Sequence, residues 1–218
     1  TTGMKPIVVS YAGFLTMRAC EMIRTFVAYP GLNVKFIGLN GGMLGGEREG
    51  VTHQFYEDVG ILRSMPGVKI LTPADAQQAY LAAKAMLAED GPVYLRFGRP
   101  SVPNFTDPDE EFVIGKAKQL RDGKDVALLA NGDTVCLALR AAEMLKAEGV
   151  SARVLDIHTI KPLDVEAVEA AITERTTLII AQRSRGYAWR PSLFPPGFKP
   201  LADMIHQRHP GVRLMVDT

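Results

Sequence analysis

Acidic side chains gather around a glycine-rich segment, residues 41–50, in the first quarter of the chain. Successive glycines let backbone N–H groups converge, so this segment alone is typical of an anion nest. Hydrolysis of a glycosidic bond needs two carboxyl groups separated by about 5–10 Å. Glu47, Glu49, Glu57 and Asp58 offer such groups. The residue types therefore leave two hypotheses open, a carbohydrate hydrolase and an ordinary solvated loop.

The composition is that of a globular protein with balanced charge. The 218 residues include 25 Lys and Arg against 24 Asp and Glu, which gives a formal net charge of +1. This balance argues against nucleic acid or an anionic membrane as a partner bound through bulk charge. Hydrophobic residues make up 47% of the chain, enough for one large or two small domains with buried cores.

The cysteines and the apolar runs predict a cytoplasmic protein. Cys20 and Cys136 lie far apart in apolar helical contexts, which favours free thiols over a disulfide. No apolar run of signal-peptide length follows the first residues, and no stretch of about 18 uncharged apolar residues is present. We therefore expect neither secretion by that route nor a membrane span.

Strand-like and helical patterns alternate along the chain, which predicts an α/β fold with two domains, each a mostly parallel sheet flanked by helices. A polar, proline-rich segment separates the two alternating regions. The predicted domains are residues 1–99 and 113–218, and residues 100–112 are the predicted linker. The predicted strands are residues 7–10, 34–37, 69–71, 93–97, 113–120, 126–130, 152–157, 177–181 and 212–216, and the predicted helices are residues 15–28, 55–62, 73–88, 134–147, 164–173 and 201–207.

Two sets of segments resemble a known family in both order and spacing, and together they extend over about residues 5–181. The first set comprises residues 13–19, 28–35, 46–54, 73–76 and 91–96. It resembles the pyrimidine-binding domain of transketolases, most closely the separate C-terminal subunit of split transketolases. The second set comprises residues 123–126, 130–132 and 152–164. It resembles the transketolase C-terminal domain.

The resemblance implies that this chain holds one part of a shared cofactor. In the family, thiamin diphosphate lies at an interface, where one domain binds the diphosphate with its Mg²⁺ and a partner's pyrimidine-binding domain binds the aminopyrimidine ring. Only the second task falls to this chain. Tyr11 and Phe14 match the family's stacking positions, and aromatic faces suit a flat heterocycle. Val8 stands at a third position that is aromatic in some members.

The resemblance also assigns four residues to the substrate. His53 matches a histidine that contacts the sugar's oxygens or exchanges protons, a role that imidazole fills near neutral pH. Glu49 stands where many members have Asp, and Asn40 where they often have a second His. Arg99 matches an arginine that contacts substrate phosphate through its forked donors. We expect His53 and Glu49 to be catalytic, and Asn40 and Arg99 to bind substrate.

Some family features are missing from the sequence. We find no match to the segment with the glutamate that activates the aminopyrimidine, and Glu21 on the following helix is an unsupported substitute. The diphosphate motif is also missing, and after residue 182 the chain lacks the family's Glu-His pair. The chain therefore reads as a transketolase C-terminal half that is truncated at its N-terminus and divergent after residue 182.

The leading functional hypothesis is a transketolase-like subunit that transfers ketol units between sugar phosphates only with a diphosphate-binding partner. We expect a homodimer or a heteromer with an N-terminal transketolase-like subunit, because half of an interface should expose an apolar face. The alternative is a diverged protein without thiamin chemistry and with no cofactor. Such a protein would serve assembly or regulation, or would hydrolyse glycosides with the loop carboxylates.

Overall fold

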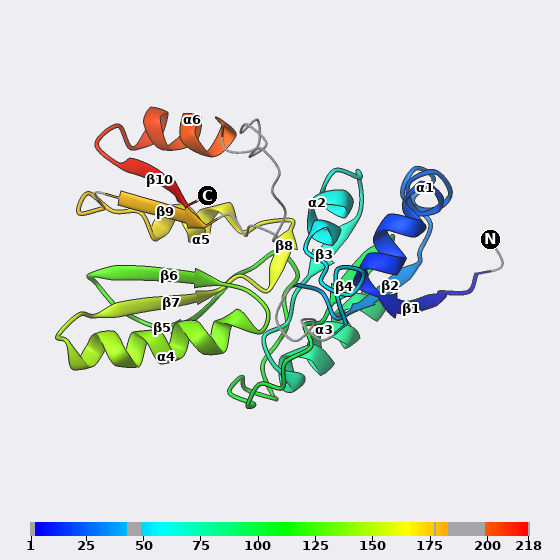
Figure 1. Cartoon of the computed structure of the whole chain (residues 1–218), viewed down its shortest axis with the longest axis horizontal. Coiled ribbons are helices and arrows are strands. Elements are labelled where there is room, and N and C mark those ends of the chain that lie inside the picture. Colours follow the sequence, from blue (N-terminus) through cyan, green and yellow to red (C-terminus); the bar gives the residue numbers. More distant parts are fainter. Residues whose placement is uncertain (1–2, 43–48, 177, 183–198, 218) are drawn as a thin grey trace. The chain divides into compact units, whose positions relative to one another are not determined.

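The computed structural model describes residues 3–42, 49–176, 178–182 and 199–217 (Figure 1). The chain divides into two compact units, Thr1–Ala167 and Val168–Thr218. The sheets are mostly parallel and flanked by helices, so the predicted α/β class is confirmed. The divergence that we predict after residue 182 begins in residues 183–198, outside the described part of the chain. No helix among the described residues is long and apolar enough to cross a membrane.

A five-stranded sheet forms the centre of the first half of the chain. Its order is β1-β2-β4-β3-β8, in which the first four strands are parallel and β8 is antiparallel to β3 (Figure 1). The strands are β1 (Ile7–Tyr11), β2 (Lys35–Leu39), β3 (Lys69–Leu71), β4 (Val93–Arg96) and β8 (Thr159–Lys161). The predicted strands of this half are all present, whereas β8 lies in a segment for which we predicted neither strand nor helix.

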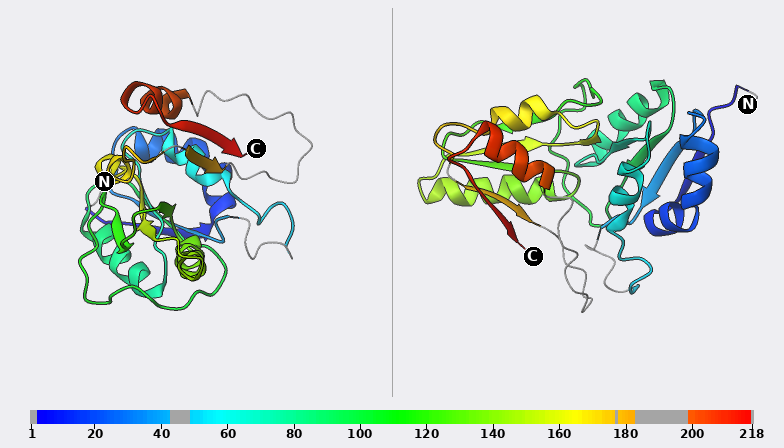
Figure 2. Two further views of the ribbon diagram at one scale, coloured as in Figure 1. Left: turned by 90° about the vertical axis from the view of Figure 1, so that its left-hand side faces the viewer. Right: turned by 90° about the horizontal axis from the view of Figure 1, so that it is seen from above.

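Helices cover both faces of this sheet (Figures 1 and 2). One face carries η1 (Phe14–Arg18), α1 (Cys20–Met22), η2 (Ile23–Ala28) and α2 (Glu57–Arg63), and the other carries α3 (Ala76–Ala88). Side chains alternate along a strand, so Tyr94 packs in the core of the first face while Val93 and Leu95 pack against α3. Burial on both faces explains why β3 and β4 read as apolar runs.

The predicted helix 15–28 has π-helical turns at both ends, η1 and η2. Inside the first of these turns, the buried Thr16 hydroxyl donates to the carbonyl of Ala12, with 2.7 Å between the oxygens. Such a side-chain bond to the preceding turn competes with the regular backbone ladder and bends helices. The apolar spacing predicted the helix correctly, but the wider winding follows from contacts that the spacing does not describe.

A second, three-stranded sheet has the order β5-β7-β6. Its strands are β5 (Lys118–Arg121), β6 (Val126–Ala130) and β7 (Ala152–Asp156), and α4 (Thr134–Ala147) packs on β6 and β7. β6 and α4 have the bounds that the sequence predicts. Ala142 on α4 and Ala152 and Val154 on β7 form the buried core between this helix and the sheet. The small alanines let the helix approach the sheet closely.

The C-terminal unit contains a pair of parallel strands, β9 (Leu178–Gln182) and β10 (Arg213–Asp217), together with α6 (Lys199–Arg208). The boundary between the two units falls within α5 (Val165–Ala170). In this unit Arg208 pairs with Glu169, which ties α6 to the end of α5. Asp164 accepts a hydrogen bond from the Ala167 amide at 3.2 Å, as expected of a capping residue at the start of a helix.

Polar side chains stabilise the region where β7 of the second sheet leads into β8 of the first. Lys161 on β8 donates to the carbonyls of Arg63 and Met65 at the end of α2, a position where a cation favours a helix. Gln78 on α3 donates to Asp156 at the end of β7, with 2.6 Å between the atoms. Asp75 caps α3 through the Gln78 amide.

The segment after β4 is held by the same Asp75. Its carboxylate accepts from the amides of Phe105 and Thr106 and from the Thr106 hydroxyl, at 2.6–2.8 Å. These hydrogen bonds favour the charged form and hold the pKa of Asp75 below its ordinary value, although burial alone would raise it. The segment that we predicted as a linker is therefore anchored to the N-terminus of α3.

Two buried groups near this junction have pKa values that are shifted in opposite directions. Burial raises the pKa of Asp156 from 3.8 to about 7 despite its hydrogen bond from Gln78, and its Oδ1 has no hydrogen-bond partner. Burial also lowers the pKa of His158 from 6.5 to about 4, and its ring lies against that of Phe112 at 4.1 Å between centroids. Burial disfavours the charged form in both cases.

These shifts predict a pH dependence that cancels in the wild-type chain. Asp156 binds a proton on folding between its two pKa values, so it lowers the free energy of unfolding as pH rises from about 4 to about 7. His158 releases a proton on folding, so it raises that free energy as pH rises from about 4 to about 6.5. Asp156→Asn removes the first effect. The free energy of unfolding should then increase, by on the order of 3 kcal/mol, as pH rises from about 4 to about 6.5.

Urea unfolding at several pH values across this window checks the prediction. We expect a nearly flat curve for the wild type and a fall with rising pH for His158→Gln, the complementary variant. An Asp156→Asn curve parallel to that of the wild type would contradict the assignment.

Candidate functional site

The predicted site residues lie at one edge of the first sheet. β1, β2 and β4 are adjacent and parallel, so their carboxyl ends meet at the same edge, where ligands bind in open α/β sheets. Tyr11 ends β1, Asn40 follows β2, and Arg99 follows β4. Backbone bonds from Phe97 to Gly38 and from Gly41 to Phe97, at 2.9 and 2.8 Å, hold the ends of β2 and β4 together.

An aromatic group stands at the end of β1. The ring centroids of Tyr11 and Phe14 are 5.6 Å apart, and the His53 ring lies 5.0 Å from the first and 5.1 Å from the second. All three pairs meet edge to face, the arrangement that the charge distribution of aromatic rings favours. The guanidinium of Arg18 lies 4.2 Å from the Phe14 ring centroid. Tyr11 is 38% exposed, so the group can be reached from solvent.

His53 reaches this group from a turn that folds back onto the sheet. The amides of His53 and Gln54 donate to the Gly50 carbonyl at 3.0 and 3.2 Å. Directly after the turn, Phe55 pairs with Gly42 in an antiparallel bridge. Thr52 Oγ1 and His53 Nδ1 are hydrogen-bonded at 2.9 Å, which leaves Nε2 for other partners.

A second group lies at the ends of β2 and β4. Arg99 forms an ion pair with Glu49 through Oε2, and Asn40 Nδ2 donates to the same oxygen at 3.4 Å. Asn40 has a φ of 56°, in the left-handed region that few residues other than glycine adopt. The side chains of Arg99 and Glu49 are 38% and 29% exposed. Two donors therefore converge on one carboxylate oxygen at the surface.

A buried ion pair supports both groups from below. Asp58 on α2 is fully buried and accepts from the Tyr94 hydroxyl and from Arg96 Nε, both at 2.7 Å. Burial and the Asp58 charge raise the pKa of Tyr94 well above its ordinary value, so its proton stays in place. A Cβ at Gly41 would lie 2.6 Å from Arg96 Nε, and one at Gly38 2.1 Å from the Tyr94 hydroxyl. Both glycines are therefore required where the chain crosses this pair.

The structure thus places the six predicted site residues in two groups, an aromatic group of Tyr11, Phe14 and His53 and an anion group of Asn40, Glu49 and Arg99. Val8 lies exposed on β1, and the Glu21 carboxylate accepts from Thr25 on its own helix. The sequence analysis missed the support that Arg96 and Asp58 give the site. Asp58 was considered only as a hydrolytic acid, and its place in the first turn of α2 does not by itself indicate burial.

Two of the four carboxylates of the hydrolase hypothesis are paired with arginines. Asp58 is buried against Arg96, and Glu49 is paired with Arg99. Glu47 lies outside the described residues. Within the described ranges, no group of three or more His, Cys, Asp or Glu side chains is arranged to hold a metal ion.

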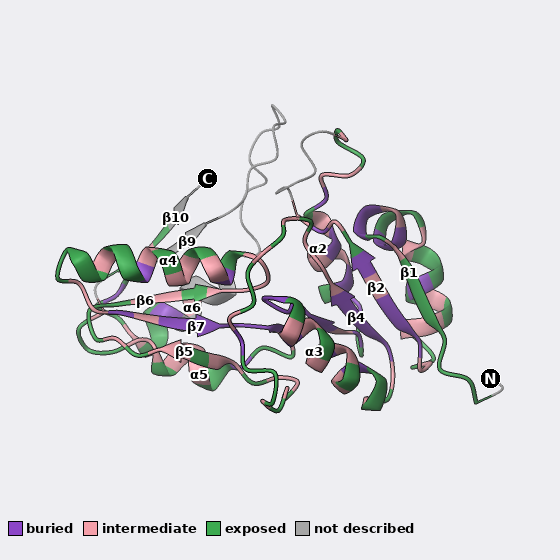
Figure 3. Ribbon diagram, turned by 90° about the horizontal axis from the view of Figure 1, so that it is seen from below, coloured by how far each residue is buried: buried purple, intermediate pink, exposed green. Residues whose placement is uncertain are grey.

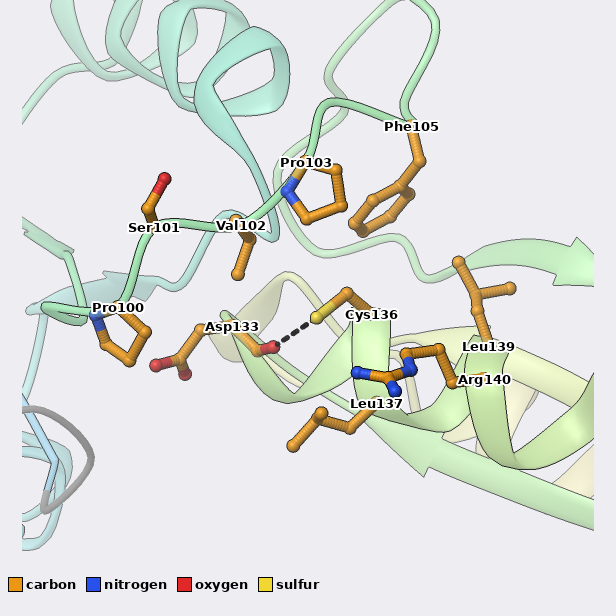
Figure 4. Close-up of a pocket in the computed structure, with 10 residues that line it drawn as sticks. All are labelled: Pro100, Ser101, Val102, Pro103, Phe105, Asp133, Cys136, Leu137, Leu139 and Arg140. Carbon is orange, nitrogen blue, oxygen red and sulfur yellow. Dashed lines mark hydrogen bonds between the residues drawn. The ribbon is translucent and has the colours of Figure 1, made fainter.

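A separate pocket of about 420 Å³ lies between the segment after β4 and the first turns of α4 (Figure 4). Its walls are mostly apolar, with Asp133, Cys136 and Arg140 as the chemically active members. Cys136 Sγ lies 3.3 Å from the Asp133 carbonyl (Figure 4). None of the six predicted site residues lines it.

Comparison with known proteins agrees with this geometry. Residues 1–104 match the family described as transketolase, pyrimidine binding domain, and residues 115–185 match transketolase, C-terminal domain. A solved structure entitled "Split gene transketolase, inactive beta4 tetramer" superposes with a TM-score of 0.78 at 32% identity, over 98% of this chain and 67% of that one. The chain belongs to the transketolase family. The predicted resemblance is therefore confirmed.

Two curated transketolase subunits are also similar. The 6-deoxy-6-sulfo-D-fructose transketolase subunit of Clostridium sp. (strain MSTE9) is 40% identical over 182 residues, 84% of this chain and 56% of that protein. An apulose-4-phosphate transketolase subunit of Phocaeicola vulgatus is 40% identical over 182 residues, 83% of this chain and 58% of that protein. The chain spans about half the length of these relatives. They do not favour the hydrolase or the non-catalytic alternative.

The aromatic group of this transketolase-family chain depends on a glycine. Gly13 directly precedes Phe14, and a Cβ at Gly13 would lie 2.5 Å from Cδ2 of Phe55. Gly13→Ala should lower the free energy of unfolding by about 1–3 kcal/mol, because a buried ring has to move. Chemical denaturation measures the change.

Gly60→Ala is the matched control, because a Cβ there meets nothing within 4 Å and the residue lies inside α2. It should raise the free energy of unfolding by about 0.5–1 kcal/mol through helix propensity. If the Gly13 variant were as stable as the Gly60 variant, the packing of Phe55 beneath the aromatic group would be wrong.

Proposed function

We propose that this chain is the pyrimidine-binding subunit of a split transketolase and transfers ketol units between anionic sugars together with a diphosphate-binding partner. The observation that carries the proposal is the convergence of six side chains, drawn from β1, β2, β4 and the turn before α2, at one edge of the sheet. The likeness to named transketolase subunits supports it. The proposal includes the predicted domains, residues 1–99 and 113–218 joined by 100–112, and the family matches to residues 1–104 and 115–185 support these bounds, which differ from the division of the structure into compact units after Ala167.

The aromatic group suits the aminopyrimidine of thiamin diphosphate. Tyr11 and Phe14 offer partly exposed ring faces at the end of a strand, and the matched family is a pyrimidine-binding domain. In this proposal the two rings hold the heterocycle and exclude water from it. The chemistry that the cofactor supplies when bound is a nucleophilic carbon that accepts a two-carbon ketol unit. We assign the diphosphate and Mg²⁺ to the partner.

The turn and the anion group suit the sugar. His53 Nε2 is left free by the hydrogen bond at Nδ1, so it can donate to or accept from a substrate hydroxyl. Glu49, the second predicted catalytic residue, stands beside it in the chain and faces the same edge through Arg99. Arg99 and Asn40 offer donors to a phosphate or sulfonate. The names of the two relatives, which act on a sulfosugar and a sugar phosphate, agree with an anionic substrate.

An exposed apolar surface supports the proposed partner. β1 is an edge strand whose residues are exposed beside the buried β2 and β4 (Figure 3). Ile7 and Val9 on this strand, Met22 and Phe26 on the following helices, and Tyr29 directly after them are between 49% and 90% exposed. A patch of this kind marks an interaction surface. We infer a homodimer or a heteromer with an N-terminal transketolase-like subunit. The free thiols Cys20 and Cys136 suit the cytoplasm.

Binding of the cofactor tests the aromatic group. The chain mixed with a diphosphate-binding transketolase subunit should bind thiamin diphosphate and Mg²⁺ in a calorimeter, and should show ketol transfer. Tyr11→Ala in that mixture should weaken binding about tenfold, because an aromatic contact is worth about 0.5–1.5 kcal/mol beyond its buried area. Tyr80→Ala, an exposed tyrosine on α3, should bind as the wild type does. Absence of binding in the mixture would refute the proposed function.

The role of His53 is tested by turnover. His53→Asn should lower kcat in the same mixture by about 100-fold or more, as expected on loss of a general acid–base group. Cofactor affinity should change far less than kcat. His206→Ala, an exposed histidine on α6, is the control and should keep the wild-type rate. Equal losses in both variants would remove His53 from the proposed mechanism.

A further inference from the structure

The anion group contains a carboxylate where the proposed substrate should place its own charge. Arg99 and Asn40 both direct their donors to Oε2 of Glu49. A guanidinium and an amide that converge on one oxygen form the donor set that recognises phosphate and sulfonate oxygens. The Glu49 carboxylate therefore occupies the position in this site where the oxyanion of a ligand would bind.

The backbone supports this assignment. Asn40 has a φ of 56°, in the left-handed region that asparagine adopts more readily than most residues other than glycine. Here Gly41 donates to the Phe97 carbonyl at 2.8 Å, which locks the turn after β2 beside the residues that lead to Arg99. The backbone of the turn that carries Asn40 is thus held by contacts that do not involve Glu49.

The site contains two arginine–carboxylate ion pairs, Arg96 with Asp58 and Arg99 with Glu49, and they differ in their exposure to solvent. The side chains of Arg96 and Asp58 are 15% and 0% exposed, so an external anion cannot replace Asp58. Those of Arg99 and Glu49 are 38% and 29% exposed. A pair with this exposure contributes little to stability and costs little to separate. Among the described residues, Glu49 is the acidic partner that the structure gives Arg99.

We propose that Glu49 is an internal competitor that occupies the anion pocket of Arg99 and Asn40, and that the terminal phosphate or sulfonate of the sugar binds by displacing it. This inference rests on the proposed function, because it names the substrate feature that the same site selects. Displacement leaves a free carboxylate beside the bound anion. The pocket therefore binds oxyanions more weakly than its donors alone allow, and Glu49 sets how strongly a substrate's charge is discriminated.

Titration of the isolated chain with inorganic phosphate tests the proposal without a partner or a cofactor. Glu49→Gln keeps the shape of the side chain and removes its charge, so phosphate should bind about tenfold more tightly at low ionic strength. Glu57→Gln is the matched control and should bind as the wild type does, since Glu57 Oε2 accepts from the Tyr56 amide rather than from Arg99. Methanesulfonate in a parallel titration distinguishes a site for sulfonates from one for phosphates.

The double variant Glu49→Gln with Arg99→Gln should lose the gain in phosphate affinity, because it lacks the Arg99 guanidinium that Glu49→Gln alone makes available. Thermal unfolding of each variant verifies that it is folded, and Glu49→Ser gives a second route to the same uncharged pocket. Phosphate affinity that is unchanged in both Glu49 variants, or a gain that persists in the double variant, would overturn the proposal. A failure of ketol transfer in the mixed subunits would leave this titration unaffected, so the two proposals fail separately.

Discussion

Asp58 is a charged group that the structure buries completely, and its two partners come from the strand at the centre of the first sheet. A buried carboxylate is tolerated only when it is paired and hydrogen-bonded, and removing one partner from such a pair costs about 3–5 kcal/mol. Arg96 and Tyr94 meet that requirement, and in doing so they fix α2 against β4. The chain that crosses above them needs glycine at 38 and 41, because a Cβ at either position would collide with the pair. The end of β2, which leads into Asn40, is thereby held directly against this buried pair.

The second sheet is attached to the first by a different kind of contact. β8 adds three residues to the edge of the first sheet, Lys161 reaches the end of α2, and Gln78 spans from α3 to Asp156. The amide of Gln78 is oriented by its other hydrogen bond, since its oxygen accepts from the Ala74 amide at 2.7 Å. Its nitrogen must therefore donate to Asp156. This junction is polar and buried, so its strength follows the protonation of Asp156 and His158 rather than apolar area alone.

The sequence predicted the order of strands and helices better than the contacts between segments that are distant in the chain. Alternating strand and helix patterns are local, and they placed β6 and α4 correctly and indicated a mostly parallel sheet. β8 escaped prediction because it consists of three residues whose partner, β3, lies far earlier in the chain. The π-helical turns escaped because apolar spacing does not distinguish them from a regular α-helix, and in the first of them the Thr16 hydroxyl donates to the Ala12 carbonyl. For the site, family resemblance supplied six residues, but the pairing of Glu49 with Arg99 joins two distant loops and required coordinates.

The two groups at the sheet edge share a physical property that the buried pair beneath them lacks. Their side chains satisfy one another: the His53 ring lies against Tyr11 and Phe14, and Glu49 occupies the donors of Arg99 and Asn40. Edge-to-face contacts and partly exposed ion pairs are each worth about 1 kcal/mol or less. A ligand with a flat ring and an oxyanion can therefore exchange its own contacts for these at small cost. The buried Asp58 pair cannot be exchanged, so it keeps the edge in place while the surface contacts change.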